Sequence, residues 1–138
     1  MIESKNYISV LLPTFNCEET ILSTLESIKW GDEIVVIDSF STDNTIEIAS
    51  NFGARIIQNK YINSAKQKNF ALKYCNYDWV FQIDSDEILE DDAEDIIRTA
   101  IENTKQNIHC FKMARKNHVL GKWLKFGGLY PDWEFRLF

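Results

Sequence analysis

The chain of 138 residues is 45% hydrophobic and 13% aromatic, which is enough apolar material for the core of one domain and too much for a disordered segment. It has no apolar stretch of about eighteen residues, and its N-terminus lacks the basic and apolar regions of a signal peptide, so we expect a cytoplasmic protein. A net charge of −6 argues against general nucleic-acid binding, which requires a basic surface.

The charge is distributed unevenly along this single domain of residues 1–138. Residues 1–104 contain eight Lys and Arg against nineteen Asp and Glu, a balance of −11, whereas residues 105–138 contain seven against two, a balance of +5. We therefore expect the two parts to face different partners. The three cysteines are far apart and lack the ligand spacing of a zinc site, which indicates ordinary reduced thiols.

The first elements in chain order form a βαβ unit. Residues 7–15 and 33–38 are apolar runs typical of buried parallel strands, and residues 17–30 between them are predicted to be a helix with acids in its first turn. The apolar residues of this helix fall on one stripe, with one leucine beside it: Ile21, Leu25, Ile28 and Leu22.

The alternation of strands and helices continues to residue 115. Residues 41–53 are predicted to form a helix capped by Ser41 or Thr42 and stopped at Gly53. The other expected elements are strands at 54–59, 78–84, 109–115 and from Trp133 onward, and helices at 63–75 and 91–104. After about residue 116 we expect a loop before the last strand. The pattern predicts an α/β fold with a mainly parallel sheet and helices on both faces.

Three expected strands end in polar clusters. These clusters are "PTFN" at 13–16, "DSFSTDNT" at 38–45 and "DSDE" at 84–87. In open α/β sheets, ligands bind beyond the carboxyl ends of the strands. We therefore expect the three clusters to converge on one pocket.

The cluster after the strand at 78–84 has the residue types of a cation site. Asp84 and Asp86 are two apart in extended chain and can face one ion while Ser85 turns aside. Oxygen ligands suit Mg2+ or Mn2+, held partly by substrate phosphates. Alternatively, Asp84 and Asp86 belong to a solvated acidic turn at the start of the next helix. An EF-hand is excluded because Ile88 and Leu89 stand where that loop needs an oxygen ligand and a glycine.

The two earlier clusters have residues that suit a base or a ribose. Asp38 follows a strand and can accept hydrogen bonds there, as can Asp43 from the next loop. Asp43 could instead only support the start of a helix. Thr14 and Asn16 could be a turn and cap pair, although Pro13 fixes the backbone so that both enter the crevice.

Together these motifs resemble a known family. "PTFN", "DSFSTDNT", "QKN" at 67–69 and "DSD" after an apolar strand, in this order and spacing, resemble the family 2 glycosyltransferases of the GT-A fold. "LGKW" and "GGLYPDWEFRLF" look most like the lipopolysaccharide-core β-glucosyltransferase-like branch. The resemblance covers essentially the whole chain. Members usually continue past the "RLF" ending, so we expect a GT-A (Rossmann-like) domain that is truncated at its C-terminus.

The resemblance implies a nucleotide-sugar donor, with UDP as the expected nucleotide. Asp84 and Asp86 would bind the metal that bridges the diphosphate, and Lys68 and Asn69 would lie near the diphosphate or the sugar. An ordinary solvated helix explains Lys68 equally well. The complete set of expected donor-binding residues is Pro13, Thr14, Asn16, Glu18, Asp38, Asp43, Lys68, Asn69, Asp84 and Ser85.

The expected chemistry needs a base as well as a cation. Cleavage of a glycosyl phosphate bond develops negative charge on the diphosphate, which a divalent cation neutralises. The acceptor hydroxyl must lose a proton, and a single displacement inverts the anomeric carbon. Asp132 is the first candidate for the base and Glu134 the second, although either could be a plain loop acid. The base of family members can also lie beyond residue 138.

The basic C-terminal part indicates the acceptor. Cationic and aromatic side chains alternate there: Lys112, Arg115, Lys116, Lys122, Lys125 and Arg136 with Trp123, Phe126, Tyr130 and Trp133. Such a surface suits an anionic saccharide or glycolipid at the inner face of a membrane, as in bacterial envelope glycan synthesis. Alternatively, some of these aromatic residues pack into the core.

Two other functions fit part of the pattern. A phosphatase or phosphotransferase could use Asp84 as nucleophile and Asp86 as acid, but that class prefers Thr or Val where Glu87 stands. A fragment that binds a nucleotide-sugar without turning it over is the second alternative.

Overall fold

The computed structural model describes residues 6–116, 118–119, 122–123, 130 and 132–138. Its strands are β1 (Ile8–Thr14), β2 (Glu33–Asp38), β3 (Arg55–Gln58), β4 (Trp79–Gln82), β5 (Phe111–Arg115), β6 (His118–Val119), β7 (Lys122–Trp123) and β8 (Asp132–Leu137). Its helices are α1 (Ile21–Ser27), α2 (Thr45–Phe52), α3 (Ser64–Leu72) and α4 (Ala93–Glu102).

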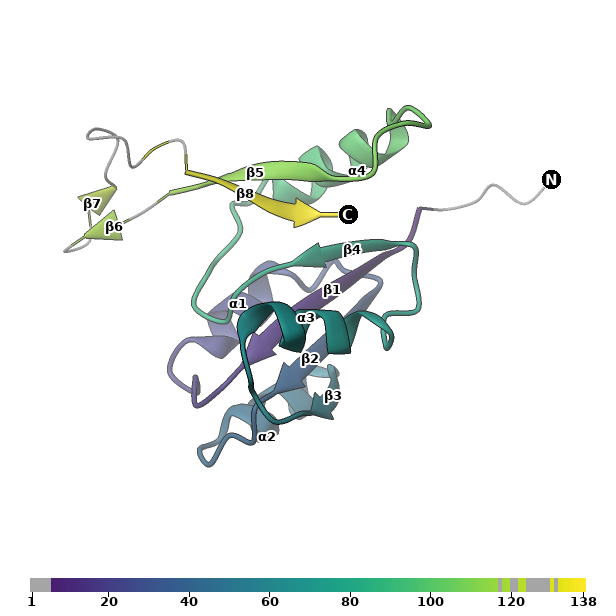
Figure 1. The fold of residues 1–138 in the computed structure, drawn as a ribbon. Coiled ribbons are helices and arrows are strands. Elements are labelled where there is room, and N and C mark those ends of the chain that lie inside the picture. The colour runs from purple at the N-terminus through teal and green to yellow at the C-terminus, as the bar shows by residue number, and fades with distance from the viewer. Residues whose placement is uncertain (1–5, 117, 120–121, 124–129, 131) are drawn as a thin grey trace.

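The main sheet has six strands in the order β3-β2-β1-β4-β8-β5. The first four strands in this order pair in parallel, and β8 runs antiparallel to both of its neighbours. Figure 1 shows α3 in front of the sheet and α1, α2 and α4 behind it. The predicted α/β fold, with a mainly parallel sheet and helices on both faces, is therefore confirmed.

The alternation of side chains along β1 builds a core on each face of the sheet. Val10 and Leu12 pack into a cluster with Leu25 of α1, whereas Leu11 faces Ala71 of α3. Burial of each such aliphatic side chain contributes roughly 1.5–3 kcal/mol, apart from alanine. The two cores fix the position of β1 and so the position of the polar cluster that follows it.

Helix α1 begins at Ile21, four residues later than the prediction. The carbonyl of Cys17 accepts hydrogen bonds from the backbone N–H of Thr20 and of Ile21, and this turn ends before the helix. The acids of this segment, including Glu18, therefore precede the helix, and the prediction of acids in its first turn was wrong. Leu22 is 51% exposed and lies outside the buried stripe.

Helix α2 begins at Thr45, so the predicted cap at Ser41 or Thr42 was wrong. Its first turn is supported by Asp43, whose Oδ1 accepts a hydrogen bond of 3.0 Å from the backbone N–H of Thr45. The predicted end at Gly53 is confirmed, because Gly53 has the left-handed backbone conformation of a C-terminal cap, with a φ of 95°.

The C-terminal part is more structured than the sequence predicted. The expected loop contains the short antiparallel pair of β6 and β7, and the last strand begins at Asp132. Lys125 and Phe126 lie outside the described residues, as do the side chains of Lys122 and Trp123.

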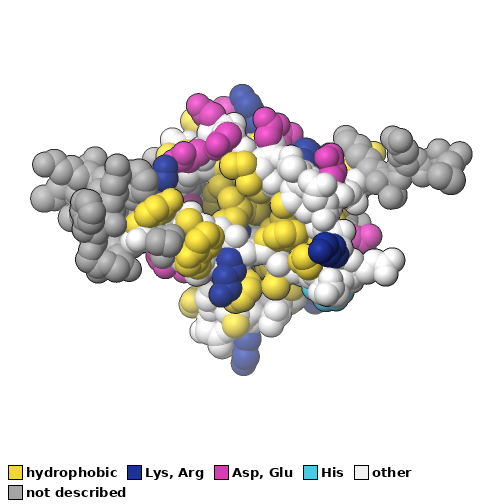
Figure 2. All heavy atoms as spheres, turned by 90° about the horizontal axis from the view of Figure 1, so that it is seen from above, with side chains coloured by type: hydrophobic (Ala, Val, Ile, Leu, Met, Phe, Trp, Pro, Cys, Tyr) yellow, Lys and Arg dark blue, Asp and Glu magenta, His cyan; other side chains and the backbone are white. Residues whose placement is uncertain are grey.

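The face formed by β5, β8 and α4 exposes apolar side chains. Figure 2, seen from above Figure 1, shows them gathered in the middle of this face with acidic side chains along one rim. Ile96, Trp133 and Phe135 are the large exposed apolar residues of these three elements. The ammonium group of Lys112 lies 4.6 Å from the centre of the Phe135 ring. No described helix has the length and apolar character needed to cross a membrane.

We predict that Gly53→Ala lowers the free energy of unfolding by about 1 kcal/mol, because an L residue is strained in the left-handed region. A Cβ at Gly53 would meet no atom within 4 Å, so the loss comes from the backbone alone. Urea unfolding measures it, with Gly53→Asn as the matched control that should lose less. An alanine variant as stable as the wild type would contradict this account.

Candidate functional site

The polar clusters of β1 and β2 meet at the carboxyl edge of the sheet. The backbone N–H of Asn16 donates to Ser41 Oγ at 2.9 Å, and Asn16 Oδ1 accepts a bond of 2.8 Å from the Thr42 N–H. Asn16 adopts a positive φ of 43°, which asparagine tolerates better than most residues. The two loops therefore form one hydrogen-bonded ledge.

Asp38 is the buried centre of this ledge, with no exposed surface. Its Oδ1 accepts bonds from the hydroxyls of Thr14 at 2.7 Å and Ser41 at 2.6 Å. Its Oδ2 accepts bonds from the Ser41 N–H at 2.8 Å and from Gln58 Nε2 at 3.4 Å. Both oxygens are thus engaged inside the protein, where they fix the ledge. A direct contact of Asp38 with a donor stays a prediction.

Glu18 and Asp43 link the start of α1 to the start of α2. Glu18 Oε2 accepts a bond of 2.9 Å from the Asn44 N–H, and Asp43 Oδ2 accepts one of 3.2 Å from the Glu18 N–H. Although desolvation raises the pKa of Asp43, the hydrogen bonds from Thr45 and Glu18 outweigh it and lower that pKa below its usual value. Both acids therefore hold the loops together in this structure.

A cleft of about 590 Å³ opens beside the ledge, between the carboxyl ends of β1 and β4 and helix α3. It brings together half of the predicted donor-binding residues: Pro13, Thr14, Lys68, Asp84 and Ser85. Asn69 is exposed and is not among the described residues that line this cleft.

Two aromatic walls of this cleft were not predicted from the sequence. Phe15 is 60% exposed and Tyr61 is 55% exposed, and both line the cleft. Between them, the buried Gln67 donates to Ser39 Oγ at 3.1 Å and accepts from Asn59 Nδ2 at 3.0 Å. Phe15 could have been predicted, because it lies inside the polar motif "PTFN" at the end of β1. Tyr61 could not, because no motif marks the loop between β3 and α3.

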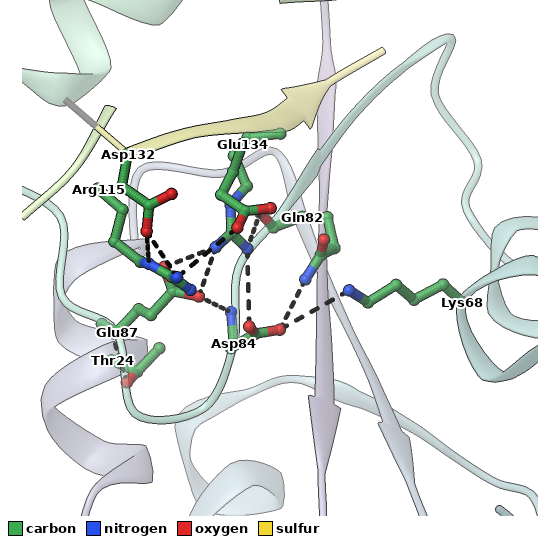
Figure 3. Close-up of polar contacts among 9 residues, drawn as sticks. Thr24, Lys68, Gln82, Asp84, Glu87, Arg115, Asp132 and Glu134 are labelled. Atoms are coloured by element: carbon green, nitrogen blue, oxygen red, sulfur yellow. Dashed lines mark hydrogen bonds and ion pairs between the residues drawn. The ribbon is translucent and has the colours of Figure 1, made fainter. Parts of the chain in front are cut away.

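The acidic loop after β4 closes the other end of the cleft. Asp84 Oδ1 accepts a bond of 2.9 Å from Gln82 Nε2 and lies 3.9 Å from Lys68 Nζ, as Figure 3 shows. Asp84 Oδ2 lies 3.9 Å from Arg136. Asp86 is exposed. One carboxylate of the pair is thus partly neutralised by the protein, and the other is free to meet a ligand.

Helix α1 and its N-cap residue, Thr20, hold this loop through hydroxyl groups. Thr20 Oγ1 donates to the Ser85 carbonyl at 2.9 Å, and Thr24 Oγ1 lies within hydrogen-bonding distance of two carbonyls, 3.0 Å from that of Ser85 and 2.7 Å from that of Glu87. Thr24 is fully buried, so water cannot take the place of its hydroxyl. The position of the loop therefore depends on α1.

Glu87 forms an ion pair with Arg136 of β8. Both carboxylate oxygens lie 2.8 Å from Arg136 NH2. Burial raises the pKa of Glu87, and the neighbouring Asp84 raises it further, while the guanidinium of Arg136 opposes both effects. No pattern in the sequence indicates this pair.

The carboxylates of Asp84 and Asp86 suit a hard divalent cation, because they supply only oxygen atoms. Among the described residues, no group of three or more His, Cys, Asp and Glu side chains is arranged to hold a metal ion. A cation here would therefore need further oxygen ligands from a bound diphosphate or from water.

The two candidate bases lie on β8. Asp132 Oδ2 accepts bonds from Arg115 Nε at 3.0 Å and NH2 at 2.7 Å, and Glu134 lies 3.7 Å from the same guanidinium (Figure 3). The hydrogen bond to Asp132 raises the pKa of Arg115. A second cavity of about 910 Å³ adjoins the acidic loop and is lined by Asp84, Asp86 and Arg115. The role of either acid as a base stays a prediction.

Comparison with known proteins decides the family of this chain. The family model described as Glycosyl transferase family 2 matches residues 9–136. The chain belongs to this family. The predicted membership of family 2 is therefore confirmed.

Curated glycosyltransferases share part of this sequence. An uncharacterised glycosyltransferase of Rickettsia typhi is 40% identical over 91 residues, which cover 65% of this chain and 31% of that protein. The lipopolysaccharide core biosynthesis glycosyltransferase LpsC of Rhizobium meliloti is 28% identical over 119 residues, which cover 83% of this chain and 44% of that protein. The chain thus spans less than half the length of these two relatives.

A solved structure with bound ligands has a similar fold. Glucosyl-3-phosphoglycerate synthase of Mycobacterium tuberculosis, in complex with Mn2+, UDP and glucosyl-3-phosphoglycerate, superimposes with a TM-score of 0.53 and 33% identity. The match covers 58% of this chain and 33% of that one.

We predict that Thr24→Val lowers the free energy of unfolding by about 1–3 kcal/mol, because buried carbonyls of the acidic loop lose their donor while the side-chain shape is kept. Urea unfolding measures the loss. Thr20→Val is the matched control, and it should lose less because Thr20 is exposed and water can replace its hydroxyl. Equal losses in the two variants would be evidence against this account of the loop.

Proposed function

We propose that this chain is the donor-binding part of an inverting, metal-dependent glycosyltransferase. It takes a sugar from a nucleoside diphosphate, with UDP as the nucleotide, and transfers it to a saccharide or glycolipid acceptor in bacterial envelope glycan synthesis. The observation that carries the proposal is the cleft of about 590 Å³, which has aromatic walls and ends at Lys68, Asp84 and Ser85.

The chemistry of the cleft matches a nucleotide diphosphate. Phe15 and Tyr61 present exposed rings on which a base can stack, next to the hydroxyl group of Ser39. Lys68 supplies a positive charge beside Asp84, where a diphosphate would lie. The UDP and Mn2+ bound by the similar synthase of Mycobacterium tuberculosis support this assignment.

Asp84 and Asp86 are the proposed ligands of the cation. When bound, Mg2+ or Mn2+ would act as a Lewis acid that neutralises the departing diphosphate. Lys68 would add a second positive charge at the same phosphates. Asp38, Asn16, Glu18 and Asp43 would fix the ledge against which the base and ribose lie.

The proton of the acceptor hydroxyl needs a carboxylate base on this chain or beyond it. Asp132 Oδ2 accepts hydrogen bonds from Arg115 and would have to leave that guanidinium to accept a proton. Glu134 lies farther from Arg115, at 3.7 Å, and is the second candidate. Two parts follow from this assignment: residues 1–104 bind the donor, and residues 105–138 begin the acceptor site.

The acceptor is proposed to be anionic or attached to a membrane lipid. Lys112 lies beside the ring of Phe135, and Trp133 is exposed on the same strand. A cation beside exposed aromatic rings suits the interface of an anionic bilayer. The similarity to LpsC supports an acceptor of the lipopolysaccharide type.

A binding module without turnover is the second candidate. The observation that favours it is the engagement of Asp132 by Arg115, which leaves this carboxylate occupied. Transfer assays on the chain of 138 residues distinguish the two candidates. The family assignment argues against the third candidate, a phosphotransferase with Asp84 as nucleophile.

We predict that Asp86→Ala abolishes the gain in UDP affinity that Mn2+ provides and leaves the fold intact, because it removes the exposed carboxylate of the pair. Calorimetric titration of UDP with and without Mn2+ measures the gain. Asp91→Ala removes the same charge from an exposed position beyond the loop and should keep the gain. An unchanged gain in Asp86→Ala would refute the assignment of the metal ligands.

We also predict that Lys68→Met weakens metal-free UDP binding by about tenfold, because a charge-assisted contact to phosphate is lost. Uridine binding should change little, since uridine carries no phosphate. Lys66→Met, an exposed lysine of the same helix, is the matched control. Equal effects of the two variants on UDP binding would mean that Lys68 acts only through the general charge of α3.

A further inference from the structure

Arg136 is a buried cation surrounded by the acidic loop. It is 6% exposed, although arginine is almost never fully buried unless it is paired. Its NH2 lies 2.8 Å from both oxygens of Glu87, and its NH1 lies 3.4 Å from the Gln82 carbonyl and 3.9 Å from Asp84. One guanidinium thus contacts the end of β4 at Gln82 and two acids of the loop, Asp84 and Glu87.

The sheet fixes the position of this guanidinium. Strand β8 pairs antiparallel with β4 at Phe81 and Leu137, and the backbones of Val80 and Phe138 exchange hydrogen bonds of 2.7 Å and 3.0 Å. Arg136 therefore reaches the loop from a strand that is held in place by its pairing with β4. Thr24 of α1 holds the carbonyls of the same loop.

Both members of the pair line the second cavity, but each is already engaged by the protein. Arg136 is 6% exposed, and the carboxylate of Glu87 is held by this guanidinium and by the Asp84 N–H at 3.1 Å. The pair carries no net charge, because a carboxylate and a guanidinium cancel. Its effect on a cation at the loop must therefore be mainly geometric.

We propose that the Glu87–Arg136 pair is a positioning device that fixes the backbone of residues 84–87 so that Asp84 and Asp86 face one cation. The inference rests on the proposed function, because it assumes that these aspartates hold the cation. The pair joins a strand of the acceptor part to the metal loop of the donor part. Arg136 is thus a positioning residue for metal-dependent donor binding.

A purely structural pair would have a different effect. If Glu87 and Arg136 only stabilised the fold, their loss would lower UDP affinity equally with and without Mn2+. If they position the loop, their loss lowers only the gain that Mn2+ provides, because Lys68, Phe15 and Tyr61 of the metal-free cleft stay in place.

The test uses the double variant Glu87→Gln/Arg136→Met, which removes both charges and so keeps the net charge of the loop. Calorimetry measures UDP affinity with and without Mn2+, and hydrogen exchange measures the backbone N–H groups of residues 84–87 without ligands. We expect metal-free UDP binding within about twofold of the wild type, a loss of about tenfold in the Mn2+ gain, and faster exchange in the loop.

The matched control is Glu94→Gln/Arg98→Met, which removes an ion pair of 3.0 Å on α4 and also keeps the net charge. It should keep the full Mn2+ gain and the slow exchange of the loop. A Glu87/Arg136 double variant that keeps both would overturn the inference. A wild type without any Mn2+ gain would refute the proposed function instead, and the exchange rates of the loop would still decide the positioning role.

Discussion

The mutual repulsion of Asp84, Asp86 and Glu87 is the constraint on which this site depends. Three carboxylates within four residues repel one another unless positive groups or hydrogen-bond donors face them. Two cations of the protein contact these carboxylates: Arg136 pairs with Glu87, and Lys68 lies near Asp84. The Asp84 side chain is still 43% exposed, and Asp86 is exposed as well. The proposed divalent cation with its diphosphate would compensate these two carboxylates.

The scaffold explains why the three polar clusters share one edge. Parallel pairing of β2, β1 and β4 places their carboxyl ends together, and the two cores on either face of the sheet keep them there. The ledge around Asp38 is rigid because its donors are satisfied inside the protein. The aromatic walls of the cleft, Phe15 and Tyr61, lie on loops outside this scaffold.

The fold was predictable because hydrophobic periodicity reports burial locally. The run at 7–15 and the stripe of α1 mark the core without any knowledge of the partners. The start of α1 was not predictable. Glu18 accepts a hydrogen bond from the Asn44 N–H, 26 residues away, instead of lying in the first turn of α1. The Glu87–Arg136 pair spans 49 residues and exists only because β8 returns antiparallel beside β4. Contacts between strands that are far apart in the sequence produce no regular spacing of residues from which they could be predicted.

The most direct measurement is a crystal structure of this chain with UDP and Mn2+, in which the anomalous signal of manganese locates the ion. The account predicts one manganese at Asp84 and Asp86 that also contacts the diphosphate, with the base between Phe15 and Tyr61. A nucleotide bound elsewhere, or a manganese that avoids both aspartates, would contradict it.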